Sequence, residues 1–214
     1  MYRLVLLLIN AFIALGASAQ EAHARWSLFT NVFQNIDVGH PRLNVGIERL
    51  TPQDYCRVSA GRFVYNFSYR ERANGWSING VLGRPVNTSG IWVEFEAGYA
   101  ALDYSTKGLY SDPVQPDSLR IEEVVDLDIF KRRLDLSVML SWRLRVGERL
   151  WFSPFMGLGL RYKWVSTRGQ PEDREEVPPT DLLLVSLRDQ DGDRAAPLIR
   201  LGVLIGFTTC RCWK

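Results

Sequence analysis

The sequence predicts an all-β protein, an eight-stranded antiparallel up-and-down β-barrel with long surface loops. From residue 25 onward, apolar and polar residues alternate with a period of two, which is typical of strands whose two faces meet different surroundings. The alternating segments number eight. Connections after the second, fourth and sixth segments are short, and those after the first, third, fifth and seventh are longer. In an up-and-down barrel, all short turns then lie at one end and all long loops at the other.

The alternation is clearest between residues 133 and 145. Apolar residues occupy every second position from Leu134 to Leu144, while Asp135 and Arg143 belong to the opposite face. A helix would instead repeat its apolar positions about every three or four residues. The same pattern predicts strands at 25–33, 42–50, 55–67, 76–86, 91–104, 133–145, 150–165 and 196–209.

The third predicted strand, 55–67, changes face along its length. Val58 and Ala60 occupy even-numbered positions, whereas Phe63 and the aromatic residues that follow it occupy odd-numbered positions. One extra residue in a strand moves every later side chain to the opposite face. We therefore expect a β-bulge at Gly61.

The first residues have the pattern of a secretory signal. Arg3 precedes an apolar run from Leu4 to Leu15, and small residues at Ala17 and Ala19 fit a cleavage site before Gln20. A membrane-anchor helix is the alternative, but the run is shorter than the ~20 apolar residues that such a helix needs. We expect residues 1–19 to be a signal peptide and residues 20–214 to form one exported barrel domain.

Composition excludes two classes of protein. Hydrophobic residues make up 46% of the 214 residues and aromatic residues 12%, more apolar mass than a disordered chain carries. Basic and acidic residues are nearly balanced, 26 against 24, so we expect no nucleic-acid partner. A mean hydropathy of -0.11 leaves a membrane barrel open, because its strands average one apolar and one polar face.

Further features favour a transmembrane barrel over a soluble one. The apolar faces are continuous and the polar faces are rich in Gly, which suits the crowded interior of a narrow barrel. Aromatic residues also collect near strand ends, as they do at the two interfaces of a membrane. They are Phe63, Tyr65, Phe67, Trp76, Tyr162 and Trp164 toward the long loops, and Trp142, Phe152 and Phe207 toward the short turns. We therefore expect the apolar faces to contact outer-membrane lipid.

The polar faces would then line a narrow lumen that contains charged residues. Buried charges must be paired, because an isolated one costs several kcal/mol. One interpretation is a structural network that replaces an apolar core, and the other is a gated narrow pore. The expected lumen charge network comprises Glu48, Arg57, Glu94, Glu96, Asp135, Arg143, Arg161, Lys163 and Arg200.

The last predicted strand carries the most specific local motif. Residues 200–207 combine a polar residue, a glycine, an apolar residue and an aromatic residue at Arg200, Gly202, Ile205 and Phe207. This motif is similar to the assembly signal of small eight-stranded outer-membrane barrels, the OmpA-like and OmpX-like proteins of the porin-family type. The resemblance implies insertion by the outer-membrane assembly machinery and exposure at the cell surface. It implies no single activity.

The cysteines are Cys56, Cys210 and Cys212, an odd number for an exported protein. In an oxidising compartment, Cys56 could form a disulfide with Cys210 or Cys212. No histidine neighbours these cysteines, so we expect neither a metal site nor a cofactor.

The long loops are the natural place for binding partners. Residues 121–129 alternate again, and residues 182–187 are largely apolar, so both segments could extend their strands beyond the membrane. Such an edge could bind a surface protein by strand addition. The alternative is a longer barrel rim with no partner. The acidic run 189–193 lacks the full spacing of a calcium loop and is interpreted as a solvated turn.

Three function classes follow. The first is a structural or surface-binding outer-membrane protein without catalysis, and the second is a narrow porin-like transport channel. The third is a lipid-A-modifying enzyme, in which His40, Asp103 and Ser105 would form a Ser–His–acid arrangement. Their spacing matches no catalytic pattern, so no catalytic residue is assigned.

Overall fold

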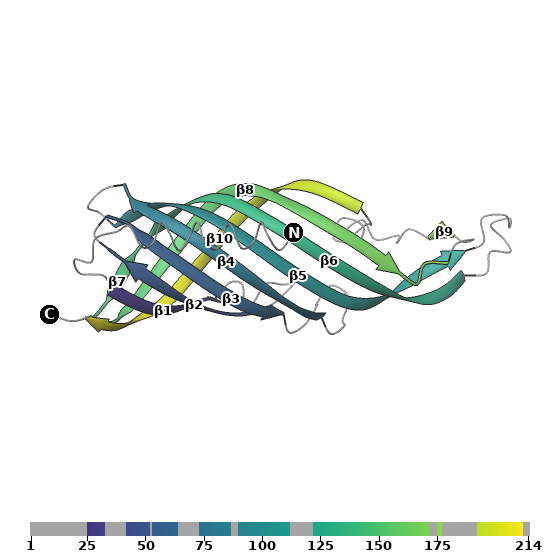
Figure 1. Cartoon of the computed structure of the whole chain (residues 1–214), viewed down its shortest axis with the longest axis horizontal. Coiled ribbons are helices and arrows are strands. Elements are labelled where there is room, and N and C mark those ends of the chain that lie inside the picture. Colours follow the sequence, from purple (N-terminus) through teal and green to yellow (C-terminus); the bar gives the residue numbers. More distant parts are fainter. Residues whose placement is uncertain are drawn as a thin grey trace, which may run out of the picture.

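The protein is a closed antiparallel β-barrel in the computed structural model (Figure 1). The structure describes residues 25–32, 42–51, 53–63, 73–86, 90–111, 122–171, 175–176 and 192–211. Within these ranges no helix is long and apolar enough to cross a membrane. The barrel strands are β1 (Arg25–Asn31), β2 (Arg42–Leu50), β3 (Tyr55–Phe63), β4 (Ala73–Pro85), β5 (Ile91–Ser111), β6 (Glu122–Trp142), β8 (Leu150–Arg168) and β10 (Gly192–Arg211).

Each barrel strand pairs with the next one along the chain, and β10 closes the cylinder by pairing with β1. The short β7 (Leu144–Val146) follows β6 and pairs with the start of β8. The two-residue β9 (Glu175–Glu176) pairs with the far end of β5. The predicted fold class, an all-β eight-stranded antiparallel barrel, is confirmed.

The largest difference from the predicted strands lies in β5 and β6. Their ladder runs from the Ile91–Trp142 pair to the Ser111–Glu122 pair, whereas the sequence predicted a loop over 105–132. The expectation that residues 121–129 extend their strand is confirmed from Glu122 onward, because their alternation continues that of residues 133–145. Figure 1 shows the resulting hairpin reaching well beyond the other strands.

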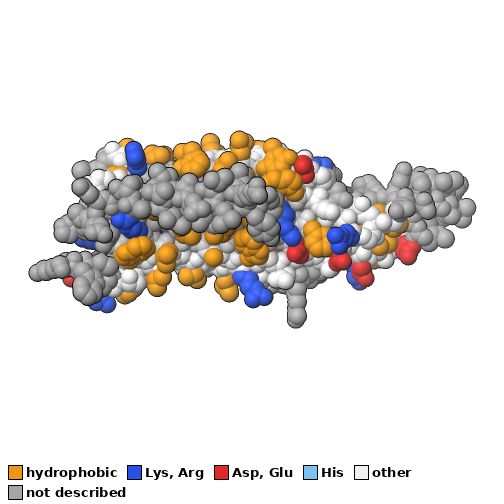
Figure 2. All heavy atoms as spheres, in the orientation of Figure 1, with side chains coloured by type: hydrophobic (Ala, Val, Ile, Leu, Met, Phe, Trp, Pro, Cys, Tyr) orange, Lys and Arg blue, Asp and Glu red, His pale blue; other side chains and the backbone are white. Residues whose placement is uncertain are grey.

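Side chains alternate between an apolar outer surface and the barrel interior. Leu158 on β8 and Ile199 on β10 are 70% and 71% exposed, although both are aliphatic. Figure 2 shows hydrophobic side chains along the barrel and charged side chains at its ends and over the hairpin. The alternation predicted from the sequence therefore holds around the barrel, with the apolar face outside.

The predicted bulge at Gly61 is wrong. The ladders of β3 with β2 and with β4 both run through Gly61 without a shift, and burial alternates from Tyr55 to Phe63. Phe63 is only 2% exposed and packs inside with Leu102 and Ile129, so it belongs to no outer aromatic belt. Phe63 is an apolar residue of the inner face, so its position resembles a change of face in the sequence although the strand continues regularly.

The possible bridge between Cys56 and Cys210 is not formed, because Cys56 is a free thiol. Cys210 on β10 lies opposite Trp26 of β1, and Trp26 lies opposite Arg49 of β2, which faces Cys56. Three inter-strand steps of about 4.8 Å separate the two cysteines, well beyond the roughly 7 Å Cα separation that a disulfide spans.

Several predictions lie outside the described residues. They are the signal peptide at 1–19, His40, Tyr65, Phe67, the apolar segment 182–187, most of the acidic run 189–193, and Cys212.

Glycines allow aromatic rings to fill the interior near the short turns. Four aromatic residues each lie directly opposite a glycine on the adjacent strand, and a Cβ on that glycine would overlap the ring. The rings belong to one buried apolar cluster. The pairs are Phe29 with Gly46, Tyr55 with Gly83, Phe155 with Gly202, and Trp151 with Gly206.

This packing makes the inner glycines sensitive to substitution. Gly83→Val should lower the free energy of unfolding by roughly 1–3 kcal/mol, because the new side chain overlaps the Tyr55 ring. Urea unfolding in detergent micelles measures the change. Leu82→Val, on the neighbouring outward position, should cost less than about 1.5 kcal/mol as a volume-similar apolar exchange. Equal losses in both variants would contradict the crowded interior.

Candidate functional site

The barrel interior holds a set of buried carboxylates. Glu48, Glu94, Glu96 and Asp135 come from β2, β5 and β6, and none is more than 6% exposed. Alternation places them inside, because each has the inward parity of its strand. A buried carboxylate needs a cation nearby to offset the loss of water. Each of the four carboxylates forms an ion pair with a different arginine.

Two ion pairs lie toward the short-turn end. Arg57 Nη2 donates to Glu94 Oε2 at 2.5 Å, and Arg143 Nη2 donates to Glu48 Oε1. Both guanidinium groups also contact aromatic rings: Arg57 lies 5.0 Å from the ring centroid of Tyr55 and Arg143 lies 4.2 Å from that of Trp151. Ring faces attract cations, so the aromatic cluster holds these arginines as well as filling space.

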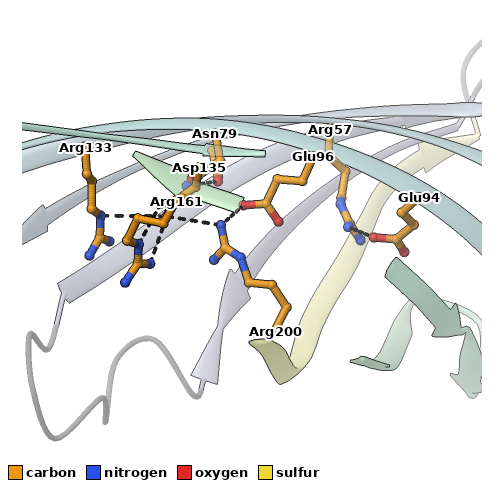
Figure 3. Close-up of polar contacts among 9 residues, drawn as sticks. Arg57, Asn79, Glu94, Glu96, Arg133, Asp135, Arg161 and Arg200 are labelled. Carbon is orange, nitrogen blue, oxygen red and sulfur yellow. Dashed lines mark hydrogen bonds and ion pairs between the residues drawn. The ribbon is translucent and has the colours of Figure 1, made fainter. Parts of the chain in front are cut away.

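A larger cluster lies further toward the long loops (Figure 3). Asp135 accepts two hydrogen bonds from Arg161, at 2.7 and 3.0 Å, which is the bidentate geometry of a strong pair. Arg133 and Arg200 approach the same carboxylate at 3.7 and 3.5 Å. Arg200 also donates to Glu96 at 2.6 Å, so it joins the carboxylates of β5 and β6.

The structure thus places eight of the nine expected lumen residues in ion pairs with one another. Lys163 has the inward parity of β8 and is half-buried. Sequence reasoning missed Arg133 and Lys131, which are 8% and 7% exposed inside β6. The sequence predicted that this strand begins at 133. Lys131 and Arg133 lie four and two residues before Asp135, so in a strand that begins earlier they share its inward face.

Two apolar clusters pack against the charge network inside the barrel. The aromatic cluster fills the short-turn end, and a second cluster that includes Phe63, Tyr104 and Val165 lies toward the long loops. A cavity of about 30 Å³ borders the first cluster at Phe29 and Phe155 and is lined elsewhere by polar groups such as Asn44 and Asn79. That volume holds one or two water molecules, on the order of what buried polar cavities contain. The described interior is a packed core of charged and aromatic side chains.

The β5–β6 hairpin is the second candidate site. Pairing of β5 with β4 ends at Tyr104, and pairing of β6 with β8 ends at Asp128. The hairpin continues to Ser111 and Glu122. The seven residues of β5 past Tyr104 correspond to about 23 Å of strand. Within the described residues, β6 carries no neighbouring strand on its outer side from 124 to 127.

The outer face of the hairpin is tied by cross-strand pairs. Arg132 donates to Asp103 at 2.5 Å, and Ser105 donates to Asp128 at 2.8 Å. Asp103 and Ser105, which were considered as parts of a catalytic arrangement, each therefore have a cross-strand partner. No group of three His, Cys, Asp or Glu side chains that could hold a metal ion occurs in the part of the chain that the structure describes.

The motif resembling an assembly signal lies on β10. Arg200 and Gly202 face the interior, where Arg200 bonds Glu96. Phe207 faces outward and is 45% exposed, and Ile205 shares its parity. The motif therefore presents its polar half to the lumen and its apolar half to the outer surface.

The Arg57–Glu94 pair provides a stability test. Glu94→Ala should lower the free energy of unfolding by about 3–5 kcal/mol, because it leaves a buried guanidinium without its carboxylate. Urea unfolding in micelles measures this. The double replacement Arg57→Met with Glu94→Met removes both charges and should recover most of the loss. An unchanged unfolding midpoint in Glu94→Ala would contradict the inward pairing.

A solved structure of an outer membrane protein is similar to the structure of this chain. No protein-family model and no curated protein matches the chain. A solved structure, the crystal structure of a major outer membrane protein from Thermus thermophilus, is similar over 87% of this chain and 99% of that chain. The two are 12% identical in sequence, with a TM-score of 0.43. At this level of similarity, the barrel architecture rests on the strand pairing of the chain itself.

Proposed function

We propose that the protein is an integral outer-membrane barrel with a structural and surface-binding role, of the OmpA-like and OmpX-like type. The observation that carries this proposal is the exposed aliphatic surface around a closed barrel. Leu158, Ile199 and Leu160 are each more than half exposed, although a soluble protein rarely exposes a continuous apolar surface of this kind. Lipid would cover it, and the inward charges would stay away from lipid.

The direction of the hairpin supports a role at the cell surface. Outer-membrane barrels have short turns on the periplasmic side and long loops outside the cell. The β5–β6 hairpin extends from the long-loop end, so in this orientation it projects from the cell. The outer-membrane assembly machinery and outer-membrane lipid are then the expected partners during insertion.

The hairpin edge is the proposed binding surface. The edge of β6 that faces away from β5 offers backbone groups at 124 and 125, beyond the point where Gly169 lies against the backbone of Asp126, together with the exposed side chains of Val124 and Asp126. An extended segment that added to this edge would form ladder hydrogen bonds, with alternate side chains on the face of Val124 and Asp126 and on the face of Val125. A partner strand in which basic and apolar residues alternate fits best.

The membrane role has a direct test. The folded protein should fractionate with outer membranes and should migrate differently on gels before and after heating, because a closed barrel resists unfolding by detergent. A soluble periplasmic protein with no heat-dependent shift would contradict the proposal. In planar bilayers we expect no steady single-channel conductance, since charged and aromatic side chains fill the interior. A steady conductance would instead favour a narrow transport channel.

Strand addition has a separate test. A synthetic peptide of alternating Lys and Val should slow hydrogen exchange at the β6 amides near Val124 that point away from β5, because these groups would enter a new ladder. The matched control is a peptide of alternating Glu and Val, which Asp126 and Asp128 should repel. Equal protection by both peptides, or by neither, would contradict the proposed edge.

A further inference from the structure

One arginine on the outer surface of the barrel lies among apolar and aromatic side chains. Arg62 is the second-last residue of β3, at the long-loop end, and it faces outward on the same side of the strand as Val58. In the strand register it lies between Leu43 of β2 and Trp76 of β4, which are 62% and 52% exposed. An arginine on this surface is tolerated only near the membrane interface, where its charge can meet polar groups.

The chain itself supplies no anion for Arg62. No carboxylate in the described part of the chain forms an ion pair with it. Arg132, the outward arginine of β6, is instead bound to Asp103 at 2.5 Å. The described neighbours of Arg62 on the outer face, diagonal positions included, are Leu43, Val45, Ala60, Asn74, Trp76 and Ile78. None of them is acidic, so the guanidinium donors of Arg62 remain available to a ligand from outside the chain.

Aromatic rings place Arg62 at the level of the lipid headgroups. Trp76, its cross-strand neighbour, lies 5.5 Å from outward-facing Tyr99 between ring centroids. A second pair, Tyr162 and Trp164, lies on the outer face of β8 toward the same end, at 4.7 Å. Aromatic residues of this kind gather where lipid headgroups begin. Arg62, Trp76 and Tyr99 therefore form an outer arginine patch at that level.

Apolar surface continues from the outer arginine patch toward the short turns. Val45 and Ile47 follow Leu43 on the outer face of β2, and they are 63% and 50% exposed. On β3 the outward residues below Arg62 are Ala60 and Val58. Successive outward residues are spaced about 6.8 Å apart along a strand. A lipid whose headgroup meets Arg62 would thus have its acyl chains on the same outer face, against these aliphatic side chains.

We propose that the outer arginine patch binds a phosphate of a phosphorylated glycolipid in the outer leaflet, with the acyl chains along β2 and β3. Guanidinium groups bind phosphate oxygens through paired N–H donors. The exposed Trp76 ring combines an apolar body with a polar N–H, which suits the mixed surface of a sugar headgroup. The proposal rests on the proposed function, since it needs a membrane-spanning barrel with its long loops outside the cell. It goes further by assigning a lipid class and a site.

The test measures lipid retention by the full-length folded protein in detergent micelles, with native mass spectrometry as the readout. The probe is lipid A, compared with dephosphorylated lipid A and with phosphatidylglycerol. The wild type should retain lipid A in preference to both. Arg62→Gln should weaken retention of lipid A about fivefold, as expected for one basic residue at an anionic membrane surface. The same variant should leave retention of dephosphorylated lipid A unchanged.

The matched control is Arg84→Gln. Arg84 is also exposed and outward-facing, and it forms no ion pair in the described part of the chain, but it lies at the short-turn end of β4 opposite Val93. This change should leave retention of lipid A unchanged. Trp76→Leu tests the sugar contact: it should lower retention of lipid A and leave retention of phosphatidylglycerol unchanged.

The other outcomes each overturn a part of the proposal. Equal weakening by Arg84→Gln, or full retention by folded Arg62→Gln, would overturn the site. Equal retention of phosphatidylglycerol and lipid A would overturn the glycolipid assignment. Equal retention of dephosphorylated lipid A would overturn the role of phosphate, and this comparison needs no substitution. A retained heat-dependent gel shift shows that the barrel of each variant is intact, so failure of this proposal is distinguishable from failure of the membrane role.

Discussion

Closure of the sheet is the constraint on which the rest of the structure depends. Eight antiparallel strands satisfy one another's backbone groups all the way round, since β10 pairs with β1 over seven residue pairs. Closure with so few strands leaves an interior that is wide enough only for side chains. Every second residue must then fit into that narrow space, while the residues between them face outward. The glycines opposite Phe29, Tyr55, Phe155 and Trp151 follow from this lack of space.

The same constraint explains why charged residues can form a core. If both faces of the strands carried aliphatic side chains, the sequence would not distinguish the face toward the interior from the face toward the outer surface. Charged side chains on the inner face keep that difference, provided that every carboxylate reaches an arginine. Asp135 satisfies this condition with three arginines, and Arg200 connects it to Glu96 on the neighbouring strand. Replacing one such pair by apolar residues is often neutral, so we interpret the network as a device for register more than as a source of stability.

The sequence was sufficient to predict the number of strands, the inner and outer face of most strands, and most of the lumen charges. All three follow from the alternation of apolar and polar residues. Glu48, Glu94 and Arg200 could be assigned to the interior without knowing any contact. Phe63 could not, because an aromatic residue fits either a lipid-facing belt or an interior cluster, and only the neighbouring strands decide. The failure at Cys56 has a similar cause: sequence position gives no information on how many strands separate two cysteines. Residues 121–129 alternate and were expected to be able to extend their strand, but the sequence alone did not show which part of 105–121 pairs with them.

The two ends of the barrel differ in a way that follows from their connections. Tight turns such as that at Gly147 bring charged residues such as Arg145 and Arg149 close together along the chain. Long ladders such as that of β5 and β6 instead place opposite charges across from one another, as Arg132 and Asp103 show. The extended end offers backbone edges together with exposed acidic side chains such as Asp126 as its binding groups. The two ends of the barrel therefore expose different chemistry, arginine side chains at the short turns and strand edges at the hairpin.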